Sequence, residues 1–196
     1  MQKWIARGLD ALGFVTENAM KKEVLIHALF LLAFFIFITL FKKWFAISYL
    51  PFWIGGIIGS ILPDVDHLIY VYVFKPDEQT SLRVSSLVSK RELGKTLELL
   101  ATTRSERTEL IFHTAYFQII FLVFAFLVIS SSGSLLGSGL VLAFSLHLLI
   151  DQAVDLLETD TLANWFKKIP VSLDRRQMNI YLVANIVLLL IFGFLL

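Results

Sequence analysis

The stretch VLIHALFLLAFFIFITLF, residues 24–41, decides the fold class, because it is long and apolar and contains no Lys, Arg, Asp or Glu. A helix that spans a bilayer needs about 20 mostly apolar residues, with a range of about 17–25. Four further runs of this kind follow, at residues 45–62, 110–130, 135–150 and 180–196. The sequence therefore predicts an all-α, polytopic membrane protein with about five transmembrane helices.

The composition agrees with a single integral membrane domain over residues 1–196. Of these residues, 57% are hydrophobic and 17% are charged, whereas a soluble domain carries about 25% charged residues. The mean hydropathy is +0.77. The absence of cysteine excludes disulfides and thiolate ligands. Membrane lipids are the expected partners of such a protein. The formal net charge of +1 and the lack of a dense basic patch indicate that no nucleic acid is bound.

The distribution of charge predicts the orientation. If the five runs cross in alternation, one face of the membrane receives the N-terminus, the loop 68–109 and the segment 152–179. Of the 17 Lys and Arg residues, only Lys42 and Lys43 fall on the opposite face. Cytoplasmic loops carry an excess of Lys and Arg. We therefore predict a multi-pass protein with its N-terminus in the cytoplasm and its C-terminus outside.

Two segments outside the apolar runs show helical periodicity. Residues 1–22 place apolar and charged side chains on opposite sides, which predicts a helix lying in the membrane interface. A frayed terminus is the alternative interpretation of this segment. The cytoplasmic loop 68–109 contains SKRE at 89–92, a possible capping box, followed by Leu93, Leu97 and Leu100. This pattern predicts one short amphipathic helix in the loop.

Each of the first four apolar runs brings one histidine to its cytoplasmic end, and three aspartates come to the same plane. These residues are His27, Asp64, Asp66, His67, His113, His147 and Asp151. His147 and Asp151 are four residues apart and share a helix face. Each histidine alone is typical of a hydrogen-bonded packing residue, but seven donors at one depth favour a metal site.

The donor types indicate the metal and its chemistry. Histidine and aspartate without cysteine suit Zn²⁺ first, and Mn²⁺ or Fe as alternatives. Seven donors exceed the needs of one zinc ion, so one or two ions are expected, and Asp155 is a candidate for orienting a ligand histidine. A metal lowers the pKa of bound water to about 7. The expected reaction is hydrolysis by a metal-bound hydroxide, with Asp64, Asp66 and His147 as the catalytic candidates.

The stretch GSILPDVDH, residues 59–67, resembles the signature of the LexA-binding, inner-membrane-associated metal-dependent hydrolases. His113 in FHTAYFQ, the HLLID stretch at 147–151 and His27 extend this resemblance. The family's H-R-G-x-T-H-S segment is replaced by RTELIFHTA here. The resemblance implies a metal-dependent hydrolase in the inner membrane and a link to the repressor LexA. The ligand set is also similar, more distantly, to that of zinc-dependent phospholipase C, and a site at headgroup level favours a phosphoester or lipid-type substrate.

Two other functions fit the same residues. One is a non-catalytic scaffold in which a metal holds the helices together, and the other is a metal transporter, because membrane Asp and His residues often mark ion pathways. Gly55 and Gly59 have a structural interpretation in every case. Small residues four apart let a neighbouring helix approach closely.

Overall fold

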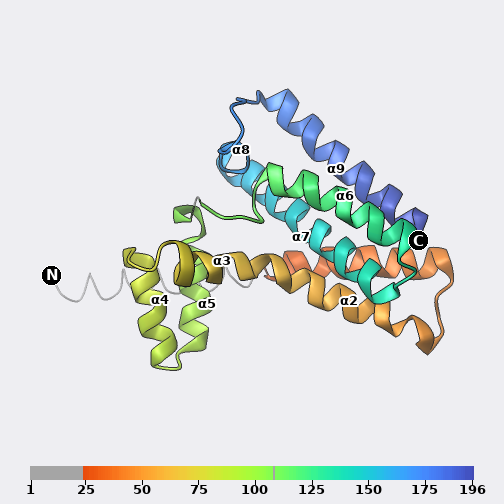
Figure 1. Ribbon diagram of the computed structural model, residues 1–196, viewed down its shortest axis with the longest axis horizontal. Coiled ribbons are helices and arrows are strands. Elements are labelled where there is room, and N and C mark those ends of the chain that lie inside the picture. Colours follow the sequence, from red (N-terminus) through yellow and green to blue (C-terminus); the bar gives the residue numbers. More distant parts are fainter. Residues whose placement is uncertain (1–23, 108) are drawn as a thin grey trace. The chain divides into compact units, whose positions relative to one another are not determined.

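The computed structural model describes residues 24–107 and 109–196, and every regular element in those ranges is a helix (Figure 1). The all-α prediction is thus confirmed. The predicted interfacial helix at 1–22 lies outside the described residues. The chain divides into a smaller unit, Met1–Ala28 with His67–Glu109, and a larger unit, Leu29–Asp66 with Leu110–Leu196.

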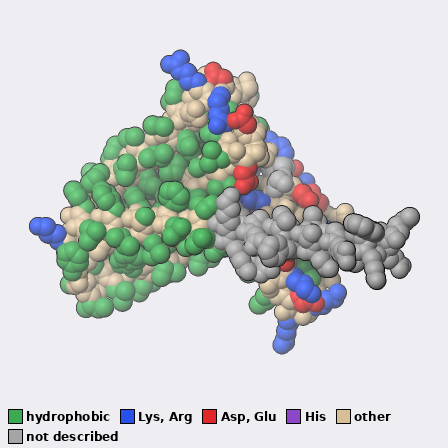
Figure 2. Space-filling view, turned by 180° about the vertical axis from the view of Figure 1, so that it is seen from behind, with side chains coloured by type: hydrophobic (Ala, Val, Ile, Leu, Met, Phe, Trp, Pro, Cys, Tyr) green, Lys and Arg blue, Asp and Glu red, His purple; other side chains and the backbone are tan. Residues whose placement is uncertain are grey.

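The larger unit is built around one central helix, α7 (Leu135–Thr159). Within the most apolar stretch of α7, 72% is buried, against 28% for α9. The surrounding helices are α2 (Leu50–Ile61), α6 (Ala115–Ser131), α9 (Arg175–Leu195) and the helix Val24–Lys42, most of which belongs to this unit. The face of these helices seen in Figure 2 is covered largely by hydrophobic side chains. An apolar outer surface around a buried central helix suits a lipid environment.

Four helical stretches are long and apolar enough to cross a membrane. They are Val24–Lys42, Ile47–Phe74, α7 and α9. The stretch Ile47–Phe74 contains α2, the short turn η2 (Leu62–Asp64) and α3 (Val65–Ile69). Helix α6 corresponds to the predicted run at 110–130. It has 17 residues and is shorter than the other four apolar helical stretches. The chain is therefore an all-α, polytopic membrane protein.

Several predicted boundaries differ from the structure. The second helical stretch continues to Phe74 rather than ending at residue 62, and α9 begins at Arg175 rather than at residue 180. Helix α6 begins at Ala115 rather than at residue 110, and α7 continues to Thr159 rather than ending at residue 150. The extension of α7 is held by packing, because Leu156 belongs to a buried cluster with Leu148 and Trp165. His147 consequently lies near the middle of α7 and not in its last turn.

Helices α2 and α7 pack closely at three glycines, as predicted for Gly55 and Gly59. A Cβ atom at Gly59 would lie 2.1 Å from the backbone oxygen of Leu140, and one at Gly55 would lie 2.1 Å from that of Leu136. Gly139 on α7 makes the reciprocal approach, with its Cβ position 2.0 Å from the oxygen of Phe52. Real Cβ atoms do not fit at such distances, so the backbones touch only because these residues are glycines.

Substituting Gly59 by alanine is expected to destabilise the protein by at least about 3 kcal/mol, the upper end of typical overpacking costs. The reason is that the obstructing atom belongs to a helix backbone, which cannot rotate away as a side chain can. Gly94→Ala is the matched control, because a Cβ there meets nothing within 4 Å. Unfolding in detergent, followed by far-ultraviolet circular dichroism, would measure both. Equal stability of the two variants would contradict the tight helix contact.

The smaller unit contains two helices where the sequence predicted one. Its elements are the π-helical turn η3 (Tyr70–Phe74), α4 (Gln79–Ser89), α5 (Leu93–Thr102) and η4 (Arg104–Glu106). The expected capping box is wrong, since Ser89 ends α4 and donates to the carbonyl of Ser86. The exposed Glu92 precedes α5 and pairs with Lys95 at 2.7 Å. That ammonium group lowers the pKa of Glu92.

Candidate metal centre

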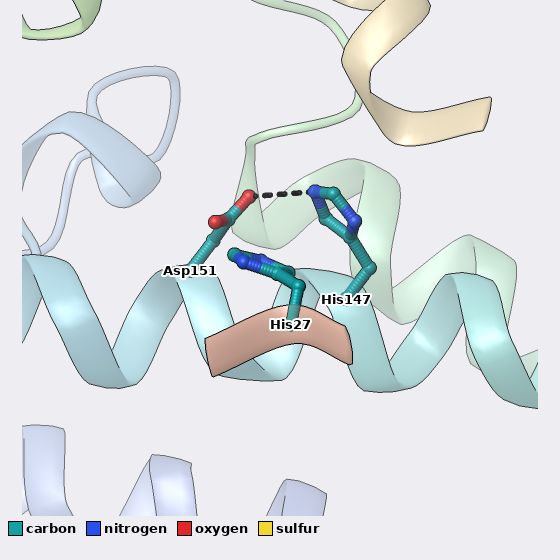
Figure 3. Close-up of side chains that lie close together, drawn as sticks. All are labelled: His27, His147 and Asp151. Atoms are coloured by element: carbon teal, nitrogen blue, oxygen red, sulfur yellow. Dashed lines mark ion pairs between the residues drawn. The ribbon is translucent and has the colours of Figure 1, made fainter. Parts of the chain in front are cut away.

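Two of the predicted donors lie one turn apart on α7 and face each other. Nε2 of His147 is 3.2 Å from Oδ2 of Asp151, and the two side chains are 5% and 1% exposed (Figure 3). Buried ionisable groups persist when they are paired or bind a cation. The four-residue spacing predicted from the sequence therefore does place both groups on one buried face of α7.

The second ring nitrogen of His147 determines its tautomer. Nδ1 lies 2.7 Å from the carbonyl oxygen of Ser60 on α2. A carbonyl only accepts hydrogen bonds, so Nδ1 carries the proton and Nε2 holds the lone pair of the neutral ring. That lone pair faces Oδ2 of Asp151 and lies 3.6 Å from Oδ1 of Asp64. The close packing of α2 at Gly59 brings the Ser60 carbonyl within reach.

Asp66 is fully buried and binds the backbone that precedes α6. Its Oδ1 accepts from the N–H of Ile111 at 3.0 Å, and its Oδ2 accepts from the N–H groups of Phe112 at 2.6 Å and His113 at 3.3 Å. These bonds hold the segment 111–113 in a non-helical conformation, which explains why α6 begins only at Ala115. The geometry shows Asp66 as an anchor for the backbone around His113.

His113 lies between two carboxylates. Its Nδ1 is 3.2 Å from Oδ2 of Asp66, and its Nε2 is 2.9 Å from Oδ2 of Asp151. Ionised carboxylates only accept hydrogen bonds, so a neutral imidazole can satisfy only one of these contacts. The other contact requires a second proton on the ring or a cation in its place.

The same oxygen of Asp151 therefore faces the Nε2 atoms of both His113 and His147. A lone pair directed at a carboxylate is unfavourable unless a positive charge lies between them. Imidazole nitrogens and carboxylate oxygens are also the donors that zinc prefers when cysteine is absent. The residues present thus fit a divalent ion. Their nitrogen and oxygen donors do not distinguish among the metals that bind such ligands.

His27 lies in the first turn of the helix Val24–Lys42, which continues unbroken into the larger unit. One ligand atom each from His27, His147 and Asp151 lies within 4.8 Å of the others (Figure 3). Three donors at this spacing form a possible metal-binding group. This group contains three of the seven donors predicted from the sequence.

His67 has a different environment within the smaller unit. Its Nδ1 accepts a hydrogen bond from Nε of the buried Arg107 at 3.1 Å. The neutral ring then carries its proton on Nε2, which is the opposite tautomer to that of His147. Asp64 differs in exposure, since its side chain is 58% accessible. The ligand roles of His67, Asp64, Asp66 and His113 stay predictions.

Trp165 was not recognised from the sequence. Its indole Nε1 donates to Oδ2 of Asp155 at 2.7 Å, and its ring centroid lies 5.7 Å from that of His113. Asp155 was expected to orient a histidine. It instead accepts a hydrogen bond from Trp165, whose ring lies beside His113. No periodicity or spacing in the segment around Trp165 signalled this role.

A pair of buried amides next to the site was also only partly foreseen. Gln118 on α6 and Gln152 on α7 donate to each other, at 3.4 and 2.6 Å, and Tyr181 on α9 donates to Oε1 of Gln118. The sequence indicated mild polarity at Gln118 but gave no partner. These bonds link three helices beside Asp151 and satisfy polar groups that lipid could not.

Comparison with known proteins adds no assignment. No protein-family model matches the chain, and neither does any curated protein or solved structure.

Proposed function

We propose that the chain is a membrane-bound, metal-dependent hydrolase that uses a divalent ion, zinc foremost, held by His147 and Asp151. His27, Asp64 and His113 are the further donors proposed for one or two ions. One observation carries the proposal. The Ser60 carbonyl accepts from Nδ1 of His147, so Nε2 of the neutral ring directs its lone pair toward the carboxylates of Asp64 and Asp151, where a bound cation would be stabilised.

The roles of the residues follow from their contacts. When bound, the ion supplies Lewis acidity, which lowers the pKa of a water molecule to about 7. The Ser60 carbonyl orients His147, and Asp66 orients His113 through Nδ1. Carboxylates that hold a ligand imidazole in this way raise its basicity. Asp64 is the accessible carboxylate beside Nε2 of His147, so its Oδ1 is the proposed acceptor of the proton released from water.

The substrate and location are part of the same proposal. A phosphoester or lipid-type substrate is preferred because the chain spans the membrane and a hydrolase there meets lipid headgroups. We place the protein in the inner membrane with its N-terminus in the cytoplasm, following the Lys and Arg asymmetry. The resemblance of residues 59–67 to the LexA-binding membrane hydrolases supports this class, and a LexA partner is proposed on that resemblance alone.

Elemental analysis of the detergent-purified full chain tests the proposal. We expect a stoichiometric amount of zinc or manganese and metal-dependent cleavage of bis(p-nitrophenyl) phosphate. Asp64→Ala should lower the cleavage rate by about 100-fold, within the range typical of proton-transfer groups, at unchanged thermal stability because the side chain is exposed. Folded wild-type protein without metal would sink the proposal. Bound metal without turnover, together with melting on chelation, would favour the structural scaffold.

Metal transport is a second candidate, favoured by one observation. Helix α7 continues to Thr159, so His147 lies near the middle of this helix rather than in its last turn. Transporter sites usually lie near the membrane midplane. Zinc uptake into proteoliposomes that contain the purified protein would distinguish this candidate, since a hydrolase should show no flux.

A further inference from the structure

We infer that Trp165 is a positioning residue, one that holds the imidazole of His113 in its orientation in the metal centre. The inference deepens the proposed function and rests on it for the identity of the ligand. It begins from a contact that neither the metal nor the carboxylates require. Trp165 lies on the short helix α8 (Ala163–Phe166) and is 2% exposed.

His113 contacts two carboxylates and one aromatic ring. Asp66 and Asp151 contact its two nitrogens, at 3.2 and 2.9 Å. The indole ring of Trp165 lies 5.7 Å away between centroids, inclined by 60°. Carboxylates at the two nitrogens fix the positions of those atoms more closely than the tilt of the ring about the line joining them. The neighbouring indole ring limits how far the imidazole can tilt.

The indole is itself held in place. Its Nε1 donates to Oδ2 of Asp155 at 2.7 Å. Asp155 follows Asp151 by one turn of α7, so the carboxylate that contacts His113 and the one that holds Trp165 stand on the same helix face. Asp155 of α7 contacts Trp165, Trp165 contacts His113, and His113 contacts Asp151 of α7. The position of the imidazole is thereby coupled to one rigid helix.

Apolar packing restricts the movement of Trp165 and shields it from water. Trp165 belongs to a buried cluster with Phe144, Leu148, Leu156 and Met178. Water cannot reach the indole side of His113 through such a cluster, and a lower local dielectric strengthens the interactions of the ring with its carboxylates. A wall of this kind is typical of the hydrophobic shell around metal sites.

Cobalt binding to the full-length protein in detergent tests the inference. Trp165→Leu removes the aromatic face, and we expect it to weaken Co²⁺ binding by about 10- to 100-fold, the range seen for outer-shell partners. Trp165→Phe keeps the aromatic face and should restore most of the affinity. The quenching of tryptophan emission by Co²⁺ should diminish in both variants, because the indole ring beside His113 is gone.

Leu156→Ala is the control for general destabilisation. Leu156 packs in the same buried cluster, so this variant should lower the melting temperature while leaving the Co²⁺ affinity within about twofold of wild type, a difference of roughly 0.4 kcal/mol. If Leu156→Ala weakens binding as much as Trp165→Leu does, the positioning role is wrong. Equal affinity of Trp165→Leu and wild type would also overturn it.

A readout without metal separates this inference from the proposed function. In metal-free protein each of the two carbon-bound ring protons of His113, assigned with His113→Gln, should give one sharp resonance, shifted by the indole ring current. Trp165→Leu should remove the shift and broaden the signal. If wild-type protein binds no Co²⁺, the proposed function fails, and the resonance still decides whether Trp165 orients His113. An unchanged resonance in Trp165→Leu would overturn the inference alone.

Discussion

Replacing His147 by asparagine is expected to abolish metal binding while the protein stays folded. The amide nitrogen of asparagine can occupy the position of Nδ1 and continue to donate to the Ser60 carbonyl, now 2.7 Å away. The substitution removes Nε2, the atom that faces Asp64 and Asp151. Loss of an outer-shell partner alone weakens metal binding 10- to 100-fold, so loss of a ligand should exceed about 100-fold.

Zinc affinity measured by competition with a chelating indicator would show this loss, and hydrolysis should fall in parallel. His147→Leu is the companion variant, because it removes both nitrogens. It should lose metal as well, and it should also lose about 1 kcal/mol of stability, since the partly buried Ser60 carbonyl keeps no donor from residue 147. Wild-type zinc affinity in His147→Asn would exclude His147 as a ligand and remove the basis of the proposed centre.

The transmembrane helices were predictable because a helix in contact with lipid needs a continuous run of apolar residues, which is visible in the sequence. Their ends were not, because the ends depend on contacts between distant residues. Helix α6 begins late since Asp66 binds the backbone of Ile111, 45 residues further along the chain. Helix α7 ends late since Leu156 packs with Trp165, which lies beyond the helix. The first pair is too far apart for any local window, and the second pair joins two different helices, so periodicity within one helix does not reveal it.

The candidate site was predictable to the same degree. Topology indicated that His147, Asp151 and His27 would meet, and the structure groups them. What sequence could not give is the direction of each nitrogen. The tautomer of His147 depends on a carbonyl of another helix, and that of His67 depends on Arg107. Trp165 lies beside His113 because the chain folds back after α7 and packs α8 against it. Sequence spacing does not predict such a reversal.

Asp66→Asn is expected to unfold the region before α6, whereas Asp64→Asn is expected to leave the fold intact. The two residues stand in the same PDVDH motif and differ in burial, with Asp66 fully buried and the side chain of Asp64 58% exposed. Both oxygens of the Asp66 carboxylate accept hydrogen bonds from backbone N–H groups, whereas the asparagine amide has only one oxygen. At least one backbone N–H among residues 111–113 then faces an NH₂ group.

The size of this effect follows from the number of donors involved. A buried donor without an acceptor costs about 1–3 kcal/mol, and bonds to a charged acceptor contribute about 1.5–3 kcal/mol each. The loss in Asp66→Asn should therefore reach roughly 3 kcal/mol or more, and backbone amides 111–113 should exchange with deuterium much faster. Asp64→Asn should weaken metal binding and leave that exchange unchanged. If both variants exchange like wild type and differ only in metal affinity, Asp66 acts as a ligand and not as the anchor of the His113 segment.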